Sequence, residues 1–289
     1  MRRLLTAVAL SMFLSTTAFS ATPAEKGKES VKEKVQELQG KKKRLSFEEA
    51  LKALSYTDRA ILLLQQGKKE EALKVLEEAQ KSLNEFLKAH PNLQLLPVDQ
   101  QIVVLQYAGA VEEAKKAVET AKKLLEEGKV QDARLILATL ADEIDVITTY
   151  LPVAMYAHVL ALAKDYVKQG KTDEALKTLA LVRGSLIVEE LVIPLPFVRA
   201  QQFVEEAMKA AKKDKKKAVE FLEAARKELE KAKVLGYAYD FQDVYKELEE
   251  EIKKAEEQIK AGKESGELLK SIEKKIGSLG QKAQSERKK

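Results

Sequence analysis

Residues 142–179 read DEIDVITTYLPVAMYAHVLALAKDYVKQGKTDEALKTL, and residues 185–198 read SLIVEELVIPLPFV. The first stretch opens with a β-branched, apolar run over 144–151 that Pro152 closes. A residue before a proline avoids the helical conformation, whereas proline itself suits the first position of a helix. The pattern therefore predicts an extended segment over 144–151, followed by a helix that ends at Gly170.

The second stretch repeats this order of elements. An apolar run over 186–193 is closed by Pro194 and Pro196, and a helical pattern follows over 197–212. A third variant of the Leu-Pro motif lies earlier in the chain, at Leu96-Pro97-Val98. There we expect an extended segment over 92–98, with Asp99 capping a long helix over 100–127.

The composition favours long helices. Glycine occurs 12 times and proline 6 times, mostly between periodic segments, and Lys, Glu, Ala and Leu are abundant. We therefore predict a mostly α protein of packed antiparallel helical hairpins, in which the two extended segments can pair as a short two-stranded β element. In such a compact stack Tyr150 and Ile193 are expected to lie close together.

A turn signature, Gly-Lys-x-x-[Glu/Asp]-Ala, recurs at Gly67, Gly128 and Gly170. It is typical of the turn between two antiparallel helices, because its alanine allows a close approach. Tetratricopeptide repeats use similar turns with a period of about 34 residues. The alanines here, at 72, 133 and 175, are not spaced in that way, so a tetratricopeptide-like array is the second interpretation.

The N-terminus has the pattern of an export signal. Arg2 and Arg3 precede an apolar stretch over 4–14, and small residues at Ala18 and Ser20 suit cleavage before residue 21. The apolar run is short for a membrane span, although a retained N-terminal anchor is the alternative. We expect a signal peptide over 1–20 and a periplasmic protein without a stable membrane span. The chain has no cysteine, which excludes disulfides, thiolate catalysis and lipid attachment at the cleavage site.

The distribution of charge predicts three further segments of the chain: a spacer, a helical domain and a C-terminal tail. Residues 21–44 are rich in Lys and Glu, with one narrow apolar stripe, so a polar, mobile spacer is expected there. The helical domain is expected over 45–235 and a charged, helical C-terminal tail over 236–289. The tail can pair with another chain as a coiled coil, which leaves a homo-oligomer open, or it can be a loosely packed, solvated terminus.

The charges argue against nucleic acid as a partner. The chain has 51 basic and 46 acidic residues, and they are interleaved along helical stretches rather than gathered in one block. Nucleic-acid-binding proteins concentrate Lys and Arg on one face. Interleaved Lys and Glu are typical of solvated helix faces joined by pairs one turn apart.

The candidate chemistry is sparse. His90 and His158 are the only histidines, too few for a zinc site, and a core position is expected for His158. Asp142, Asp145, Glu189 and Glu190 flank the extended segments and could serve acid–base catalysis, but caps of turns and helices are the commoner role of such acids. No phosphate-binding loop or hydrolase motif is present, so the sequence predicts no catalytic residues, metal or cofactor, and a protein that is not an enzyme.

Five polar residues lie beside apolar segments, where a polar group must be paired or functional. They are the candidate ligand-binding residues: Asp99, Asp145, Tyr150, His158 and Arg199. The aromatic segment over 237–245 can either grip a ligand or close the end of the helical stack, and the second role is the expected one.

The order of four short motifs resembles the YfdX family of bacterial exported proteins. The motifs are Leu-Pro-Val-Asp at 96–99, Asp-x-x-x-x-x-Leu-Pro at 145–152, Gly-Lys-x-x-Glu-Ala at 170–175, and Leu-Ile-Val-Glu-Glu-x-x-x-Pro-x-x-x-Val-Arg-Ala at 186–200. The resemblance implies a helical, periplasmic protein that is associated with stress responses and has chaperone-like activity, without known catalytic residues.

Two functions are expected from these observations. The first is a non-catalytic, periplasmic stress-protection protein that binds non-native proteins or small apolar ligands. The alternative is a helical-repeat, tetratricopeptide-like adaptor that docks one specific partner protein.

Overall fold

The computed structural model describes residues 21–42 and 48–286, so the predicted signal peptide lies outside the described residues. The described chain is mostly helical with one small antiparallel sheet, as predicted. Its elements are α1 (Pro23–Lys42), α2 (Glu48–Gln65), α3 (Lys69–Ala89), β1 (Leu95–Leu105), α4 (Val111–Glu126), α5 (Val130–Ala138), β2 (Glu143–Pro152), α6 (Val153–Lys168), α7 (Thr172–Arg183), β3 (Ile187–Pro194), α8 (Leu195–Ala210), α9 (Lys215–Val234), the short 3₁₀ helix η1 (Tyr239–Phe241), α10 (Gln242–Lys260) and α11 (Gly266–Glu286).

The two predicted extended segments are confirmed and they pair with each other. They form β2 and β3, which run antiparallel, and β2 is the central strand of the order β1-β2-β3. β-Branched residues favour a pleated, half-buried surface, which explains the run of Ile, Val and Thr along β2. Helices α6 and α8 begin directly after Pro152 and Pro194, as the proline pattern indicates.

The third strand corrects the prediction for 92–127. The chain stays extended through β1 as far as Leu105, and helix α4 begins only at Val111. Asp99 is therefore a strand residue opposite Thr149 and not a helix cap. Pro97 lies at a register shift of this edge strand, where its missing N–H costs no ladder hydrogen bond.

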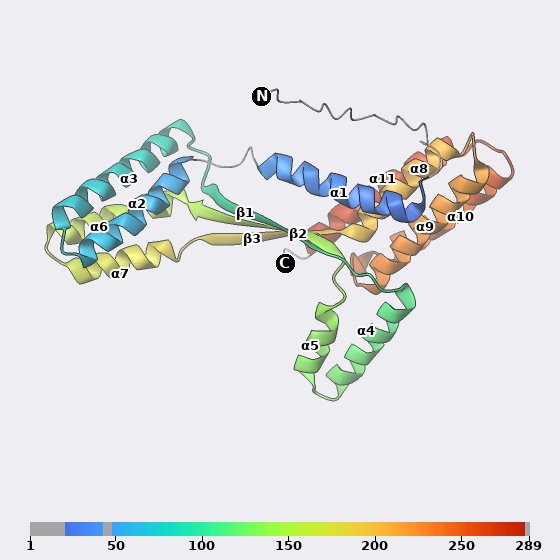
Figure 1. Cartoon of the computed structure of the whole chain (residues 1–289), viewed down its shortest axis with the longest axis horizontal. Coiled ribbons are helices and arrows are strands. Elements are labelled where there is room, and N and C mark those ends of the chain that lie inside the picture. Colours follow the sequence, from blue (N-terminus) through green and yellow to red (C-terminus); the bar gives the residue numbers. More distant parts are fainter. Residues whose placement is uncertain (1–20, 43–47, 287–289) are drawn as a thin grey trace, which may run out of the picture.

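The strands alternate in direction, so successive helical hairpins lie at opposite ends of the sheet (Figure 1). Hairpins α2–α3 and α6–α7 form a first lobe, whereas α1 and α8–α11 form a second lobe at the other end. The expected single stack is therefore wrong. Tyr150 lies opposite Ile187 and Ile193 lies opposite Ile144, at the two ends of the β2–β3 ladder.

The first lobe has its own core, built from small and large apolar residues of four helices. Leu96 and Leu151 carry this core onto the end of the sheet, and both are fully buried. The buried Tyr156 hydroxyl of α6 donates to Thr57 Oγ1 of α2 at 3.1 Å. Burial raises the pKa of Tyr156, so this hydroxyl stays a donor at neutral pH.

The glycine of each recurring turn has a left-handed backbone, with φ of +74° at Gly67 and Gly128 and +78° at Gly170. In each turn the lysine N–H bonds a carbonyl five residues back, and the glycine N–H bonds one three residues back. This is the Schellman geometry that ends a helix. The alanine of each signature is fully buried between the two helices, as the sequence predicts.

Gly170→Ala should lower the free energy of unfolding by about 1–2 kcal/mol, because a Cβ is disfavoured at positive φ. Gly40→Ala is the matched control: Gly40 lies in α1, and a Cβ there meets no atom within 4 Å. The same substitution should raise stability by about 0.5–1 kcal/mol at that helical position. Urea denaturation of the two variants checks the opposite signs, and equal signs would contradict the turn geometry.

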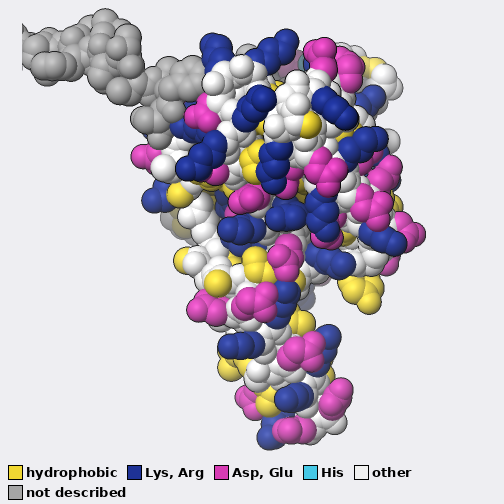
Figure 2. All heavy atoms as spheres, turned by 90° about the vertical axis from the view of Figure 1, so that its right-hand side faces the viewer, with side chains coloured by type: hydrophobic (Ala, Val, Ile, Leu, Met, Phe, Trp, Pro, Cys, Tyr) yellow, Lys and Arg dark blue, Asp and Glu magenta, His cyan; other side chains and the backbone are white. Residues whose placement is uncertain are grey.

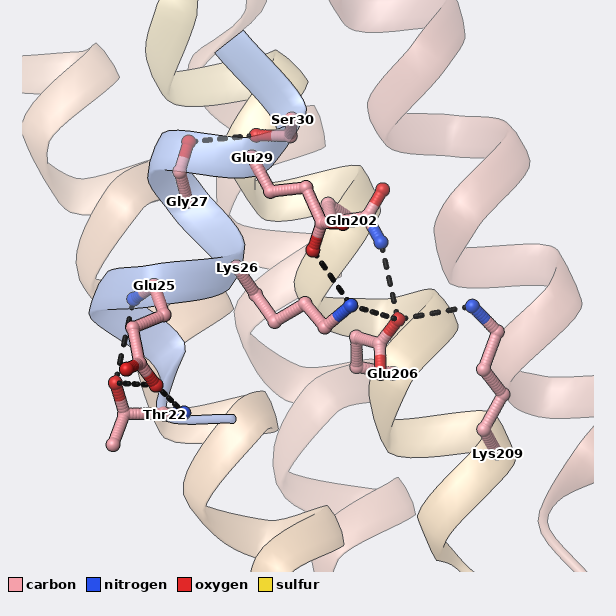
Figure 3. A network of polar contacts seen from close by, with 9 residues as sticks. All are labelled: Thr22, Glu25, Lys26, Gly27, Glu29, Ser30, Gln202, Glu206 and Lys209. Atoms are coloured by element: carbon pink, nitrogen blue, oxygen red, sulfur yellow. Dashed lines mark hydrogen bonds and ion pairs between the residues drawn. The ribbon is translucent and has the colours of Figure 1, made fainter. Parts of the chain in front are cut away.

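Helix α1 occupies residues that the sequence suggests are a mobile spacer. Thr22 and Glu25 cap it reciprocally, with the Thr22 N–H donating to Glu25 Oε2 at 2.7 Å and the Glu25 N–H to Thr22 Oγ1 at 3.3 Å (Figure 3). The narrow apolar stripe of Val31, Val35 and Leu38 packs against the sheet. One helix face is thus enough to hold a segment whose composition is polar.

Helix α1 also contacts α8, through an ion pair and a close approach of the two helices. Lys26 Nζ lies 3.8 Å from Glu206 Oε1, which also pairs with Lys209 at 2.9 Å (Figure 3). Gly27 allows the close approach, because a Cβ there would lie 3.2 Å from both Arg199 Cδ and Phe203 Cζ. Helix α1 therefore packs closely on α8 and belongs to the second lobe.

The C-terminal helices are also packed rather than loose. Leu248 and Ile252 of α10 and Ile272 and Ile276 of α11 are fully buried in one core with α8 and α9. The expected boundary at 235 therefore falls inside a single core. Of the aromatic segment, Tyr237 and Tyr245 lie in this core, in keeping with a closing role.

Hairpin α4–α5 projects from the body below the second lobe (Figure 1). Its own buried positions are the small residues Ala114, Ala121 and Ala133. An ion pair of 2.7 Å between Lys115 Nζ and Glu230 Oε1 links its first helix to α9. The hairpin thus attaches along α4 and leaves much of α5 uncovered.

Candidate functional site

Four charged side chains meet where β2 begins, between α8 and α9. Arg199 Nη2 donates to Asp142 Oδ2, and Arg199 Nε donates to Glu228 Oε2 at 2.9 Å. Lys231 Nζ lies 3.7 Å from Asp142 Oδ2 and 3.5 Å from Glu228 Oε1. We call these four residues the charge cluster; two cations balance two anions within it.

The charge cluster is largely shielded from solvent. The Asp142 side chain is 1% exposed, whereas those of Arg199, Glu228 and Lys231 are 12–15% exposed. Burial works against the charge of the Arg199 guanidinium, but the charges of Glu228 and Asp142 outweigh this effect and raise its pKa. The arginine is therefore held as a permanent cation.

The backbone of Asp142 is fixed from two sides. The Asp142 N–H donates to the Tyr237 hydroxyl at 3.0 Å, and its carbonyl accepts from the Leu195 N–H at 2.8 Å. The Tyr237 hydroxyl donates in turn to Glu143 Oε2 at 2.6 Å. The first residues of the central strand are thus tied to both α8 and the segment after α9.

A cleft of about 590 Å³ opens beside the charge cluster, and α1 forms one wall of it. Its apolar surface includes Ala24, Val31, Phe203 and Ala224. The charged residues that line it are Lys28, Arg199, Lys227 and Lys231 on the basic side, and Asp142, Glu220, Glu223 and Glu228 on the acidic side. Formal charges therefore cancel around the cleft, and Figure 2 shows the same interleaving of basic and acidic side chains over the face of the second lobe.

The sequence-predicted residues do not form one site. Asp99 and Tyr150 lie on β1 and β2, exposed and half-buried respectively, whereas Asp145 is buried between Val103 and Val192 in register. Asp145 and Tyr150 are an odd number of residues apart on one strand, so their side chains leave opposite faces of the sheet.

The prediction for His158 is wrong. The residue lies on the outer face of α6 and is exposed, while Tyr156 and Ala157 beside it are buried. Helix α6 buries only the stripe that faces α3 and α7, and His158 falls outside that stripe.

Arg199 is the one predicted site residue that lies in the charge cluster. The sequence singled out Asp142 only as one of several acids flanking the extended segments. Glu228 and Lys231 were missed, because they have the same spacing as many solvated Glu–Lys pairs in this chain. The sequence feature that could have identified them is the set of apolar neighbours Phe221, Leu222 and Leu229. These neighbours indicate that this stretch of α9 packs in a core.

Two other features are absent from the part of the chain that the structure describes, a cluster of metal ligands and a helix that could span a membrane. Within 21–42 and 48–286, no three His, Asp or Glu side chains converge as metal ligands would. Over those same residues, every helix is too short or too polar to cross a bilayer.

A comparison with known protein families finds a match over the sheet, the first lobe and hairpin α4–α5. The family model of the YfdX protein matches residues 53–192. A solved structure of Salmonella Typhi YfdX aligns over 51% of this chain and 91% of its own, with 16% sequence identity and a TM-score of 0.35. No curated protein matches the chain. The predicted resemblance to the YfdX family is thus confirmed over residues 53–192.

Proposed function

We propose that this protein is an exported, non-catalytic protein of the periplasm that binds non-native proteins during stress through the α4–α5 hairpin. The observation that supports this is a set of exposed large apolar side chains on that hairpin. Leu135 is 71% exposed, and Leu125, Val130 and Leu137 are 44–49% exposed. Exposed apolar side chains on an arm that projects from the body are available to contact the apolar segments of a non-native client.

The end of β1 carries three more exposed apolar side chains. Val103, Val104 and Leu105 are each 37–39% exposed and lead directly toward α4. β1 is also an edge strand of the sheet. An extended client segment can add to such an edge by backbone hydrogen bonds while its side chains contact apolar neighbours.

The rest of the molecule suits a protein that must stay soluble while it holds such clients. Basic and acidic side chains alternate over the helices, with pairs such as Lys34–Glu37 at 2.8 Å and Lys122–Glu119 at 2.8 Å. A mixed charged surface opposes self-association without attracting one class of charged partner. A complex with a partly unfolded client would stay dispersed for the same reason.

Leu135→Lys should reduce the protection of a thermally unfolding client by several-fold, because it places a charge on the most exposed large apolar side chain of the hairpin. Leu181→Lys is the matched control, since Leu181 is 75% exposed on α7 of the first lobe. Light scattering of the heated client at equimolar protein measures both variants. Equal protection by the two variants, or none by the unmodified protein, would rule the hairpin out.

The adaptor alternative fits the geometry less well. An array that docks one partner presents a continuous concave surface from stacked hairpins. Here strands separate the hairpins and send them to opposite ends of the sheet. The repeated turn signature marks the ends of individual helices and does not build a solenoid.

A further inference from the structure

A second cleft, of about 1100 Å³, lies between α4, α9 and α10, where the α4–α5 hairpin meets the second lobe. Six basic and four acidic residues line it, whereas the charges around the first cleft cancel. The basic residues are Lys115, Lys122, Arg226, Lys227, Lys233 and Lys246, and the acidic ones are Glu119, Glu230, Asp243 and Glu249. In Figure 2, basic side chains lie close together on this face of the lobe, just above the projecting hairpin. The second cleft thus has an excess of two positive charges.

Three of the four acidic residues are already neutralised by a lysine. The ion pairs are Lys122–Glu119 at 2.8 Å, Lys115–Glu230 at 2.7 Å and Lys253–Glu249 at 2.8 Å, and Lys253 lies outside the cleft. The other four basic residues of the cleft form no ion pair with any described residue: Arg226, Lys227, Lys233 and Lys246. A ligand anion in the cleft would therefore meet cations that are free to bond it, and it would relieve their mutual repulsion.

The remaining walls of the cleft are suited to a flat, apolar body. Tyr239 of η1 lines the cleft, and its side chain is 71% exposed, so one face of the ring is open to a ligand. Val118 of α4 and Val234 of α9 are half-buried and line it too. Aromatic rings stack on one another in offset arrangements, and each such pair contributes about 0.5–1.5 kcal/mol beyond its buried area.

Charge and walls together define a class of ligand. A dianion balances the excess of two positive charges, and a phosphate group offers several oxygens to Arg226 and the lysines. The cleft is larger than most small-molecule pockets, which enclose about 300–1,000 Å³, so a ring system fits beside the phosphate. We propose that this cleft binds a small aromatic phosphate monoester, with its phosphate among the unpaired cations and its ring against Tyr239. The proposal does not depend on client binding by the hairpin.

The test uses three probes that separate the ring from the charge: 1-naphthyl phosphate, 1-naphthol and inorganic phosphate. Each is titrated calorimetrically at pH 7.5, where a phosphate monoester is doubly charged, into protein that comprises residues 21–289. 1-Naphthyl phosphate should bind about tenfold or more tightly than either of the others. Equal affinities for 1-naphthol and its phosphate would overturn the role of the cations, and no binding of 1-naphthyl phosphate would overturn the site.

Lys246→Gln should weaken the binding of 1-naphthyl phosphate about threefold or more, because it removes one of the unpaired cations. Lys254→Gln is the matched control, since Lys254 is also an exposed, unpaired lysine of α10 within the described structure but does not line the cleft. Both variants lose the same charge from the same helix. Equal affinities of the two variants would mean that the overall charge of the lobe, and not the cleft, attracts the anion.

Tyr239→Ala should also weaken the binding of 1-naphthyl phosphate about threefold or more, because the ring loses its stacking partner. Leu181→Ala is the control, since Leu181 is as exposed as Tyr239 but lies in the first lobe. Unchanged binding in Tyr239→Ala would overturn the placement of the ring. Leu135→Lys should bind this probe normally, and loss of binding there would instead place the probe on the apolar surface of the hairpin.

Discussion

Arg199→Ala should lower the free energy of unfolding by about 3–5 kcal/mol, the typical cost of removing one partner from a buried ion pair. The variant leaves Asp142, with a side chain 1% exposed, without its main cation, and it leaves Glu228 with Lys231 alone. A buried carboxylate that has lost its partner must be solvated or protonated, and either change opens the start of β2. Urea denaturation, monitored by circular dichroism, measures this change in the free energy of unfolding.

Arg183→Ala is the matched control for this prediction. Arg183 Nε lies 2.8 Å from Asp58 Oδ1, nearly the same distance as in the Arg199–Glu228 pair, but both side chains are 41–53% exposed. An exposed pair contributes only about 0.2–1 kcal/mol, because water and salt screen it. Losses of similar size in the two variants would mean that the charge cluster is not shielded as described.

The second large effect concerns helix α1. Leu38→Lys should lower the free energy of unfolding by about 2–3 kcal/mol, since it removes one of the few apolar side chains that hold α1 on the sheet and places a charge there. Leu38 is 8% exposed. With the stripe broken, Ile144, Val146 and Ile193 of the sheet would be exposed to solvent.

Gln39→Lys, the next position, is the control, because Gln39 is exposed and the same charge there should change stability by less than about 0.5 kcal/mol. Urea denaturation separates the two variants, and binding of a hydrophobic dye reports the uncovered sheet. No difference between them would restore the interpretation of 21–44 as a spacer.

The sequence predicts those parts of the fold where local chemistry decides the conformation. β2 and β3 are bounded by prolines and filled with β-branched residues, and α6 and α8 begin at those prolines. The sequence predicts only the first part of β1 as extended, because Pro97 lies inside the strand, at a register shift, rather than at its end. Its real signal was the run Ile102–Val104, which continues past Asp99.

The charge cluster could not be predicted in the same way, because burial is a property of the assembled lobe. In the sequence, Glu228 and Lys231 have the pattern of one more solvated pair. In the structure, α8 and the start of β2 enclose them. Helix α1 is a similar case: its apolar stripe was visible, but whether three side chains suffice depends on the sheet they contact.

Because each hairpin leaves and rejoins the sheet at the same end, its length is independent of the strand register. An equal number of helical turns could be added to the end of α4 and to the start of α5, on either side of Gly128. The α4–α5 arm would then be longer, while every pairing between β1 and β2 stays in place. The reach of this arm is thus a dimension that evolution or engineering can adjust freely, without reworking either lobe.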